Sequence, residues 1–357
     1  MPQIKLAIAG IGWRSHFFAK VASELPEIFQ ITGALARDKA KGEVFASLWG
    51  IPIFSDMSAL LAAKPDYVVL LTPREASPGY ILDLAKRGVP VLTETPPAPD
   101  INTMSQLISS LPPGAKVEVA EQYQFQPMHA ARLNVISEGL LGNVSHAQVS
   151  CAHGYHGVSL IRLMLNAGYA DAKITGCSLS APLVDGPGRD GPPKAESVQA
   201  DSQTLALLDF AGKTAVFDFT GAQYFSYIRG NRVLARGERG EINNDKVSYL
   251  KSFNDPAYFN LERRDAGQNG NLFGYYHMGI MGSGKWYHEN MFAPARLTDD
   301  ELAVAMCMYK MGLYANGGES FYSVNEGAQD LYLDLMIQQA VATGETIATK
   351  SQNWKLA

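Results

Sequence analysis

IKLAIAGIGWRS (residues 4–15) is the stretch that decides the fold. Its apolar beginning, residues 4–10, predicts a short buried strand, and a helical pattern starts soon after it. The turn between them contains two glycines, which allow a tight bend and let a pyrophosphate approach the backbone at the helix N-terminus. Ser15 occupies the place of a third glycine and is still small enough for the helix to pack closely on the strand. We therefore expect dinucleotide contacts from this turn, at Gly10, Gly12, Trp13 and Arg14.

Strands and helices continue to alternate after this turn. Residues 29–37, 65–73, 89–96 and 116–125 predict further strands, and residues 38–50 and 77–88 predict helices. Strands joined by helices imply a parallel sheet with right-handed crossovers. The pattern predicts an N-terminal Rossmann dinucleotide-binding domain over residues 1–124.

The pattern changes after Pro127. A helix at residues 127–139 is followed by alternating stretches, which predict half-buried strands of an antiparallel sheet. These predicted strands are residues 145–151, 203–210, 214–219 and 231–237. A Gly/Pro-rich span, residues 181–196, predicts a loop, and helices are expected at residues 298–312 and 325–344. Residues 125–357 therefore predict an α+β domain with a large, mostly antiparallel open sheet for substrate binding and oligomerisation. The fold class is α/β overall.

Composition excludes several classes of protein. The 357 residues suit two domains, 46% of them are hydrophobic, and the net charge of −5 includes no polybasic run for nucleic acid. The start lacks a signal-peptide pattern, and no apolar run reaches the length of a membrane span. The three cysteines are widely spaced, and the histidines show no acidic partner nearby, so we expect no disulfide and no metal. The expected location is the cytoplasm.

The end of the second predicted strand bears on the choice of cofactor. A carboxylate there would accept hydrogen bonds from the ribose hydroxyls of NAD. The sequence instead gives Arg37, which can stack on adenine and pair with a 2′-phosphate, followed by Asp38, which can cap the next helix. Both NAD and NADP remain open, and Arg37 favours NADP.

Several markers together resemble the Gfo/Idh/MocA family of NAD(P)-dependent oxidoreductases. They are the glycine turn, Thr72-Pro73, Glu94-x-Pro96, the segment 122–150 and the helix opening VNEGAQDLYLDL at residues 324–335. The resemblance runs nearly end to end, and it implies a dehydrogenase or reductase acting on CH–OH groups of sugars, cyclitols or related polyols. It also implies a homodimer or homotetramer formed through the large sheet. Further cofactor contacts would come from Thr72, Pro73, Glu94, Thr95 and Gln122.

The chain departs from the family at the positions that carry its chemistry. The usual Glu-Lys-Pro reads Glu94-Thr95-Pro96, so the lysine beside the nicotinamide is replaced by Thr95. The family's Asp, His and Asp align with Ala152, His156 and Ser159, which leaves only the histidine. His156 is therefore the candidate general acid/base.

Two other side chains are candidates for the missing chemistry. Tyr123 can relay a proton. The aromatic, Gly-rich segment at residues 273–292 can close over a polyol, and its Lys285 can supply the lost charge. If these groups do not replace the lysine, the chain is a catalytically inactive regulatory protein that binds a dinucleotide or a sugar. The sequence leaves both functions open. It also does not separate the oxidoreductase from a family member that keeps tightly bound NAD for a redox-assisted elimination or hydrolysis.

Overall fold

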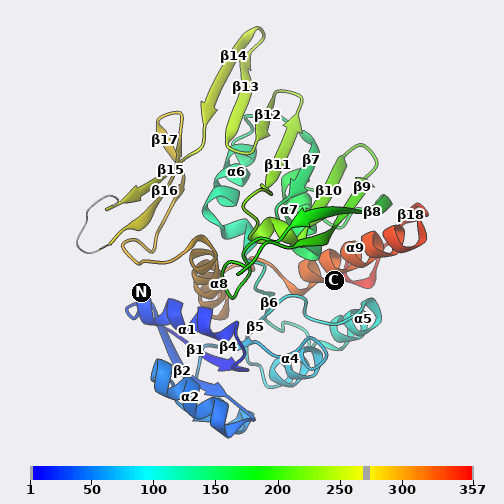
Figure 1. Cartoon of the computed structure of the whole chain (residues 1–357). Helices are drawn as coiled ribbons and strands as arrows, with labels where there is room; N and C mark the ends of the chain where they lie inside the picture. Colours follow the sequence, from blue (N-terminus) through cyan, green and yellow to red (C-terminus); the bar gives the residue numbers. More distant parts are fainter. Residues whose placement is uncertain (1–2, 268–273, 356–357) are drawn as a thin grey trace.

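The first sheet forms the lower half of the molecule in the computed structural model, which describes residues 3–267 and 274–355 (Figure 1). Its six strands are all parallel and follow the order β3-β2-β1-β4-β5-β6. The strands are β1 (Ile4–Ala9), β2 (Phe29–Leu35), β3 (Ile53–Phe54), β4 (Tyr67–Leu70), β5 (Val91–Thr93) and β6 (Val117–Val119). This is the order of a doubly wound dinucleotide-binding sheet, and it confirms the predicted fold class.

Helices cover both faces of this sheet because its strands are apolar on both sides. Along β1, Leu6 and Ile8 belong to one buried cluster, whereas Ala7 and Ala9 belong to another. The helices that connect the strands are α1 (Ser15–Glu24), α2 (Lys39–Trp49), α3 (Met57–Ala62), α4 (Ser77–Lys86) and α5 (Ile101–Ser110). Two helices from the end of the chain, α8 (Asp299–Ala315) and α9 (Val324–Thr343), also contribute to these clusters.

The second sheet has nine strands in the order β14-β13-β12-β11-β7-β10-β9-β8-β18. Its strands are β7 (Val144–Ser150), β8 (Lys173–Val184), β9 (Val198–Asp209), β10 (Thr214–Thr220), β11 (Arg232–Gly237), β12 (Gly240–Asn243), β13 (Lys246–Ser252), β14 (Asp255–Asn260) and β18 (Ile347–Ala348). Neighbours are antiparallel except β7 and β10, which pair in parallel because α7 and two strands intervene between them along the chain. The expectation of a large, mostly antiparallel sheet is confirmed, with this one parallel pairing.

A smaller sheet holds part of the predicted closing segment. It consists of β15 (Glu262–Ala266), β16 (Tyr276–Gly282) and β17 (Lys285–Glu289), and it packs against α6 (Pro127–Ser137). Three short 3₁₀ helices complete the structure: η1 (Tyr123–Phe125), η2 (Gly221–Tyr224) and η3 (Asn353–Lys355). The segment expected to close over a polyol, residues 273–292, is therefore mostly the β16–β17 hairpin. Residue 273 lies outside the described residues.

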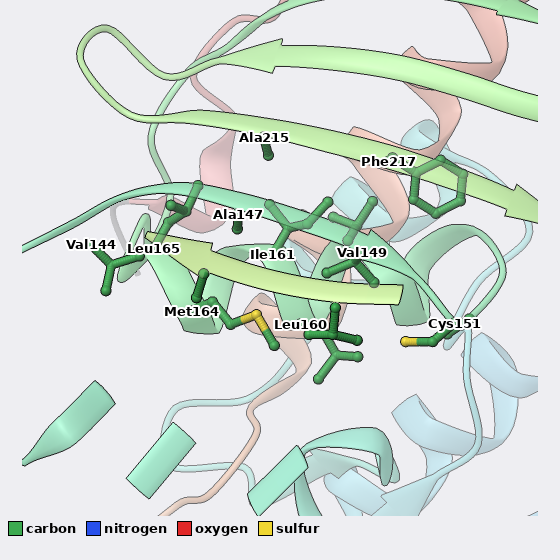
Figure 2. Close-up of a cluster of buried hydrophobic side chains, with 14 of the residues drawn as sticks. Val144, Ala147, Val149, Cys151, Leu160, Ile161, Met164, Leu165, Ala215 and Phe217 are labelled. Carbon is green, nitrogen blue, oxygen red and sulfur yellow. The ribbon is translucent and has the colours of Figure 1, made fainter. Parts of the chain in front are cut away.

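Helix α7 (Gly154–Leu165) is anchored by its apolar side chains on β7 and β10, as Figure 2 shows. The buried side chains of α7 in this cluster include Leu160, Ile161, Met164 and Leu165, and those of the strands include Ala147, Val149, Ala215 and Phe217. Truncating one such side chain to alanine costs about 2–5 kcal/mol in comparable cores. The packing matters for function because the first turn of this rigid helix carries His156.

Two sequence predictions require correction. The strand expected at residues 116–125 is β6 followed by η1, because the chain leaves the sheet edge after Val119 and turns toward α6. The loop expected at 181–196 is shorter, because β8 and β9 pair as far as Val184 and Val198. The hairpin therefore extends well beyond the body of the sheet.

Candidate functional site

A cavity of about 1360 Å³ lies at the carboxyl ends of the parallel strands, between the two parts of the chain. This edge of a doubly wound sheet is where dinucleotides bind. Every residue predicted to contact the cofactor lines the cavity, namely Gly10, Gly12, Trp13, Arg14, Arg37, Thr72, Pro73, Glu94, Thr95 and Gln122. The predicted acid/base candidates His156 and Tyr123 line it as well.

The glycine turn has the space that a pyrophosphate needs. Gly10 has a φ of +105°, and a Cβ there would lie 2.5 Å from the carbonyl oxygen of Leu71. A Cβ at Gly12 would meet nothing within 4 Å, so the backbone beside the cavity is open. Ser15 is fully buried and its Oγ donates to the carbonyl of Gly12 at 2.6 Å. The turn is therefore shaped for close approach of a phosphate to backbone N–H groups at the start of α1.

The end of β2 presents positive charge to the same cavity. Arg37 and Lys41 both line it and are exposed. Asp38 also lines it, but its Oδ1 accepts a hydrogen bond from the backbone N–H of Lys41 at 3.1 Å and caps α2. The carboxylate therefore serves the helix, and Arg37 makes no hydrogen bond within residues 3–267 and 274–355.

The tip of the β8–β9 hairpin reaches across to the glycine turn. The guanidinium of Arg189 lies 4.3 Å from the ring centroid of Trp13, within the range of a cation–π contact. Both side chains line the cavity. The hairpin thus closes one side of the cavity from the C-terminal half of the chain.

A charged cluster connects the glycine turn with the place of the missing lysine. Arg14 Nε donates to Glu94 Oε1 and Arg14 Nη1 donates to Asp300 Oδ2, each at 2.9 Å. Burial opposes the charge of Arg14, but the two carboxylates outweigh this and hold its pKa above the ordinary value. Gln122 Nε2 also donates to Asp300, at 3.3 Å.

Gln122 Oε1 is buried and has no hydrogen-bond partner among the described residues. Buried polar atoms are nearly always paired, so this oxygen is suited to accept from an amide or hydroxyl of a ligand. Together with the open backbone at Gly12, it shows that the cavity fits a nicotinamide dinucleotide.

His156 is held by a carboxylate that does not come from its own helix. Its Nδ1 lies 2.6 Å from Glu121 Oε2, and the two residues are only 6% and 1% exposed. Glu121 follows β6 and comes directly before Gln122. The pair fixes the ring of His156 and leaves Nε2 as the nitrogen available to the cavity, which is the arrangement of a general base with an orienting acid.

Helix α7 begins with a glycine in a left-handed conformation, close to a second carboxylate. Gly154 has a φ of +43°, and a Cβ there would lie 2.8 Å from Asp334 Oδ2 of α9. Asp334 accepts a hydrogen bond from the backbone N–H of Tyr155, and burial raises its pKa. Only glycine therefore lets the start of α7 approach α9 this closely.

Aromatic rings surround His156 and form the wall of the cavity. The ring centroids of Tyr123 and Tyr155 each lie 4.5 Å from that of His156. The Tyr123 hydroxyl lies 3.3 Å from that of Tyr224, which in turn lies 2.6 Å from His153 Nδ1. Burial raises the pKa of Tyr123 and raises that of Tyr155 to about 12, so both phenols stay neutral at pH 7. Burial and the neighbouring His156 lower the pKa of His153 to about 4.

The structure does not bring Lys285 to this site. Its Nζ lies 2.6 Å from Glu138 Oε2, its side chain is half exposed, and it is not among the residues that line the cavity. The reason is topological, because β17 lies beside α6 in the small sheet. The structure therefore places Lys285 away from the cavity in which it was predicted to replace the missing lysine.

Sequence reasoning missed several residues of the site, among them Glu121, Asp300 and Arg189. Glu121 was detectable, because an acidic residue between a buried strand and Gln122 has to lie near the cavity. Asp300 and Arg189 reach it from the first turn of α8 and from a hairpin tip, and no local pattern marks either contact.

Known proteins were compared with the chain at the level of sequence. The family model described as an oxidoreductase family with an NAD-binding Rossmann fold, Gfo/Idh/MocA, matches residues 4–117. Residues 4–117 therefore match the NAD-binding Rossmann domain of that oxidoreductase family. The Bacillus subtilis protein YteT, named as an oxidoreductase, is 24% identical over 157 residues, which make up 42% of this chain and 37% of YteT. The chain thus aligns with little more than a third of that relative.

Solved structures of this type share the fold over almost the whole chain. A levoglucosan dehydrogenase in complex with NADH and levoglucosan superimposes with a TM-score of 0.69 at 14% identity, covering 98% of this chain and 100% of the other. A myo-inositol dehydrogenase from Corynebacterium glutamicum gives a TM-score of 0.65 at 15% identity, covering 98% and 99%. At these identities the likeness shows that the fold is shared over almost the whole chain, including the second sheet.

Two features are absent from the described part of the chain. No helix there is both long and apolar enough to cross a membrane. Nor does that part contain a cluster of three or more histidine, cysteine, aspartate or glutamate side chains placed to hold a metal ion.

Proposed function

We propose that the protein is an NAD(P)-dependent oxidoreductase that interconverts a CH–OH group and a ketone on a neutral sugar, cyclitol or related polyol. The observation that carries this proposal is the buried hydrogen bond of 2.6 Å between His156 and Glu121, with the histidine lining the dinucleotide cavity. It supplies an oriented acid/base even though the family's lysine and aspartates are absent.

The chemistry divides between the cofactor and the chain. A bound nicotinamide accepts or supplies the hydride. During oxidation, His156 Nε2 takes the proton of the substrate hydroxyl while the C–H bond of the same carbon breaks, and Glu121 stabilises the imidazolium that forms. During reduction, His156 returns that proton to the carbonyl oxygen. Glu121 is a positioning residue in this scheme, because it acts through the histidine.

The wall around His156 supports a neutral, hydroxyl-rich substrate. Tyr123, Tyr155 and Tyr224 offer ring faces and hydroxyl groups, and His153 is uncharged at pH 7 because its pKa is about 4. Ring faces suit the C–H faces of a sugar, and the hydroxyl groups suit its oxygens. The neutral phenol of Tyr123 serves here as a hydrogen-bond donor rather than as a base.

The cofactor is proposed to be NADP in preference to NAD. Support comes from Arg37 and Lys41 at the end of β2 and from the use of Asp38 as a helix cap. Two cations suit a 2′-phosphate, whereas a carboxylate committed to a cap does not serve the ribose hydroxyls.

The open face of the large sheet supports a homo-oligomer. Leu207 of β9 is 59% exposed, and its neighbours across the sheet on that face are Thr175 and Val216. A second copy placed against this face would bury the exposed leucine. Sedimentation velocity tests this, because Leu207→Lys should shift a dimer or tetramer toward the monomer, and an unchanged profile would contradict it.

The function is tested by mixing the protein with NADPH or NADH and then with a panel of keto-sugars and inososes. Nicotinamide fluorescence reports binding, and its loss on addition of a ketone reports turnover. Binding without turnover on any member of the panel would favour the regulatory alternative. Thr95, Ala152 and Ser159 support that alternative because they lack the family's charged groups.

A further inference from the structure

The charge that a lysine at position 95 would supply has to come from another side chain, if the proposed function holds. An oxygen that gains negative charge during hydride transfer is stabilised by a fixed cation or donor beside it. Among the described residues that line the cavity, those with a permanent positive charge are Arg14, Arg37, Lys41 and Arg189.

The other three cations do not extend toward the end of β5. Arg37 lies just after β2 and Lys41 lies in the first turn of α2, and β2 is separated from β5 by β1 and β4. Adjacent strands are about 4.8 Å apart, so these two side chains start about 14 Å from the end of β5. Arg189 stacks on Trp13 of the glycine turn.

Arg14 alone extends toward the end of β5. It leaves the glycine turn at the start of α1, and its Nε contacts Glu94, the residue before Thr95, at 2.9 Å. Its Nη1 contacts Asp300 at 2.9 Å, and its side chain is only 14% exposed. Nη2 makes no hydrogen bond within residues 3–267 and 274–355. Nη2 is also not buried, and it is therefore the part of the guanidinium that is open to the cavity.

Two chains of contacts connect this guanidinium with His156. On one side, the carbonyl of Thr95 accepts from the Tyr155 hydroxyl at 3.3 Å, and the Tyr155 ring lies 4.5 Å from that of His156. On the other side, Asp300 accepts from Gln122, which directly follows Glu121. The cation and the acid/base therefore border the same part of the cavity.

We propose that Arg14 performs the electrostatic work of the missing lysine, with Nη2 donating to the substrate oxygen whose proton His156 exchanges. An arginine stays protonated, so it stabilises charge and leaves proton transfer to the histidine. Glu94 and Asp300 hold the guanidinium in a fixed orientation. The short side chain of Thr95 occupies less of the space beside it than a lysine would. The proposal deepens the oxidoreductase function and depends on it.

The test compares Arg14→Met, Arg14→Lys and the double variant Arg14→Met/Thr95→Lys with the wild type, using NADPH and whichever inosose or keto-sugar the wild type reduces. Arg14→Met should lower kcat by about 10²- to 10³-fold, the usual effect of removing one such donor. NADPH affinity should fall by a much smaller factor than kcat, since the backbone N–H groups of the glycine turn remain for the pyrophosphate. Arg14→Lys should keep more activity than Arg14→Met, and Thr95→Lys should restore at least about tenfold to Arg14→Met by returning the cation from the family's own position.

The opposite outcomes overturn the proposal. If Arg14→Met keeps the wild-type kcat, with or without a weaker NADPH affinity, Arg14 binds the cofactor or stabilises the glycine turn instead. If Thr95→Lys restores nothing, the charge at that place is not what was lost. If Arg14→Met fails to fold, the same kinetics are measured on Arg14→Met/Asp300→Asn, in which only Glu94 is left without its cation. An inactive wild type would overturn the proposed function, and this inference with it, whereas an active wild type with active Arg14 variants overturns the inference alone.

Discussion

Replacing Glu121 by glutamine tests whether His156 works as an oriented acid/base. The change keeps the size of the side chain and removes its charge. Glu121 lies 2.6 Å from His156 Nδ1, and both are buried, so the imidazolium formed during turnover loses a charge-assisted hydrogen bond. A hydrogen bond to a charged group is worth about 1.5–3 kcal/mol. Since about 1.4 kcal/mol corresponds to a tenfold change in rate, kcat should fall roughly 10- to 150-fold.

A second effect acts in the same direction. The amide of a glutamine at position 121 can donate to Nδ1, which places the remaining proton of a neutral imidazole on Nε2. That tautomer cannot accept the proton of a substrate hydroxyl. Glu121→Asp keeps the charge at a slightly greater distance and should recover part of the lost kcat. NADPH affinity should stay the same in both variants, because Glu121 does not line the cavity.

Glu118 provides a matched control three residues earlier. It is also a buried glutamate, but it binds Ser320 Oγ and the backbone N–H groups of Phe321 and Tyr322. Glu118→Gln should therefore lower the melting temperature and leave kcat of the folded enzyme unchanged. Steady-state kinetics with NADPH, together with thermal melts, separates the two roles. A Glu121→Gln enzyme that retains wild-type kcat, or loses no more than Glu118→Gln does, would refute the reasoning.

Three further predictions concern the cofactor, the small sheet and pH. In fluorescence titrations, Arg37→Ala should weaken NADPH binding roughly 10- to 150-fold and NADH binding about twofold at most. The control Arg74→Ala, at an exposed arginine, should change neither affinity. Equal effects of Arg37→Ala on both cofactors would exclude a 2′-phosphate contact. Lys285→Met should leave kcat unchanged and lower the free energy of unfolding in urea by at most about 1 kcal/mol, because its ion pair with Glu138 is at the surface. A large loss of kcat would show that Lys285 acts in the reaction after all. Burial, with a smaller effect of His277, lowers the pKa of His288 from 6.5 to about 4. Between these values the unfolded chain binds the proton first, so the free energy of unfolding should fall as pH falls from about 6.5 to 4. His288→Asn should flatten this fall, and an unchanged slope would contradict it.

The N-terminal half was largely predictable because its signals are local. The strands of the parallel sheet are rich in apolar residues, and glycine or proline marks the ends of several helices. Residues 101–110 were missed as α5, although Asp100 caps this helix and Ile101, Met104, Leu107 and Ile108 recur at helical spacing. The short β3 is held only by its pairing with Ala34 and Leu35 of β2, which no local pattern shows.

The site was predictable where it follows the strand ends and was missed where it depends on distant packing. Arg37, Thr72 and Glu94 converge because parallel strands bring their carboxyl ends to one edge. His156 reaches that edge because α7 is anchored on the large sheet. Asp300 comes from an element 286 positions after Arg14, so only the tertiary structure could show their ion pair. Lys285 was placed wrongly because aromatic and glycine content does not tell which sheet a hairpin joins.

The central claim is that this cavity transfers hydride with His156 as the acid/base. Single-turnover fluorescence tests it most directly, with saturating NADPH and each inosose or keto-sugar mixed rapidly with wild type and with His156→Asn. The account predicts that the wild type binds NADPH and oxidises it with at least one ketone, while His156→Asn binds it equally well and oxidises it about 10²- to 10⁴-fold more slowly. Equal oxidation rates in the two proteins would remove His156 from the mechanism, and NADPH binding without oxidation in the wild type would contradict the enzymatic function itself.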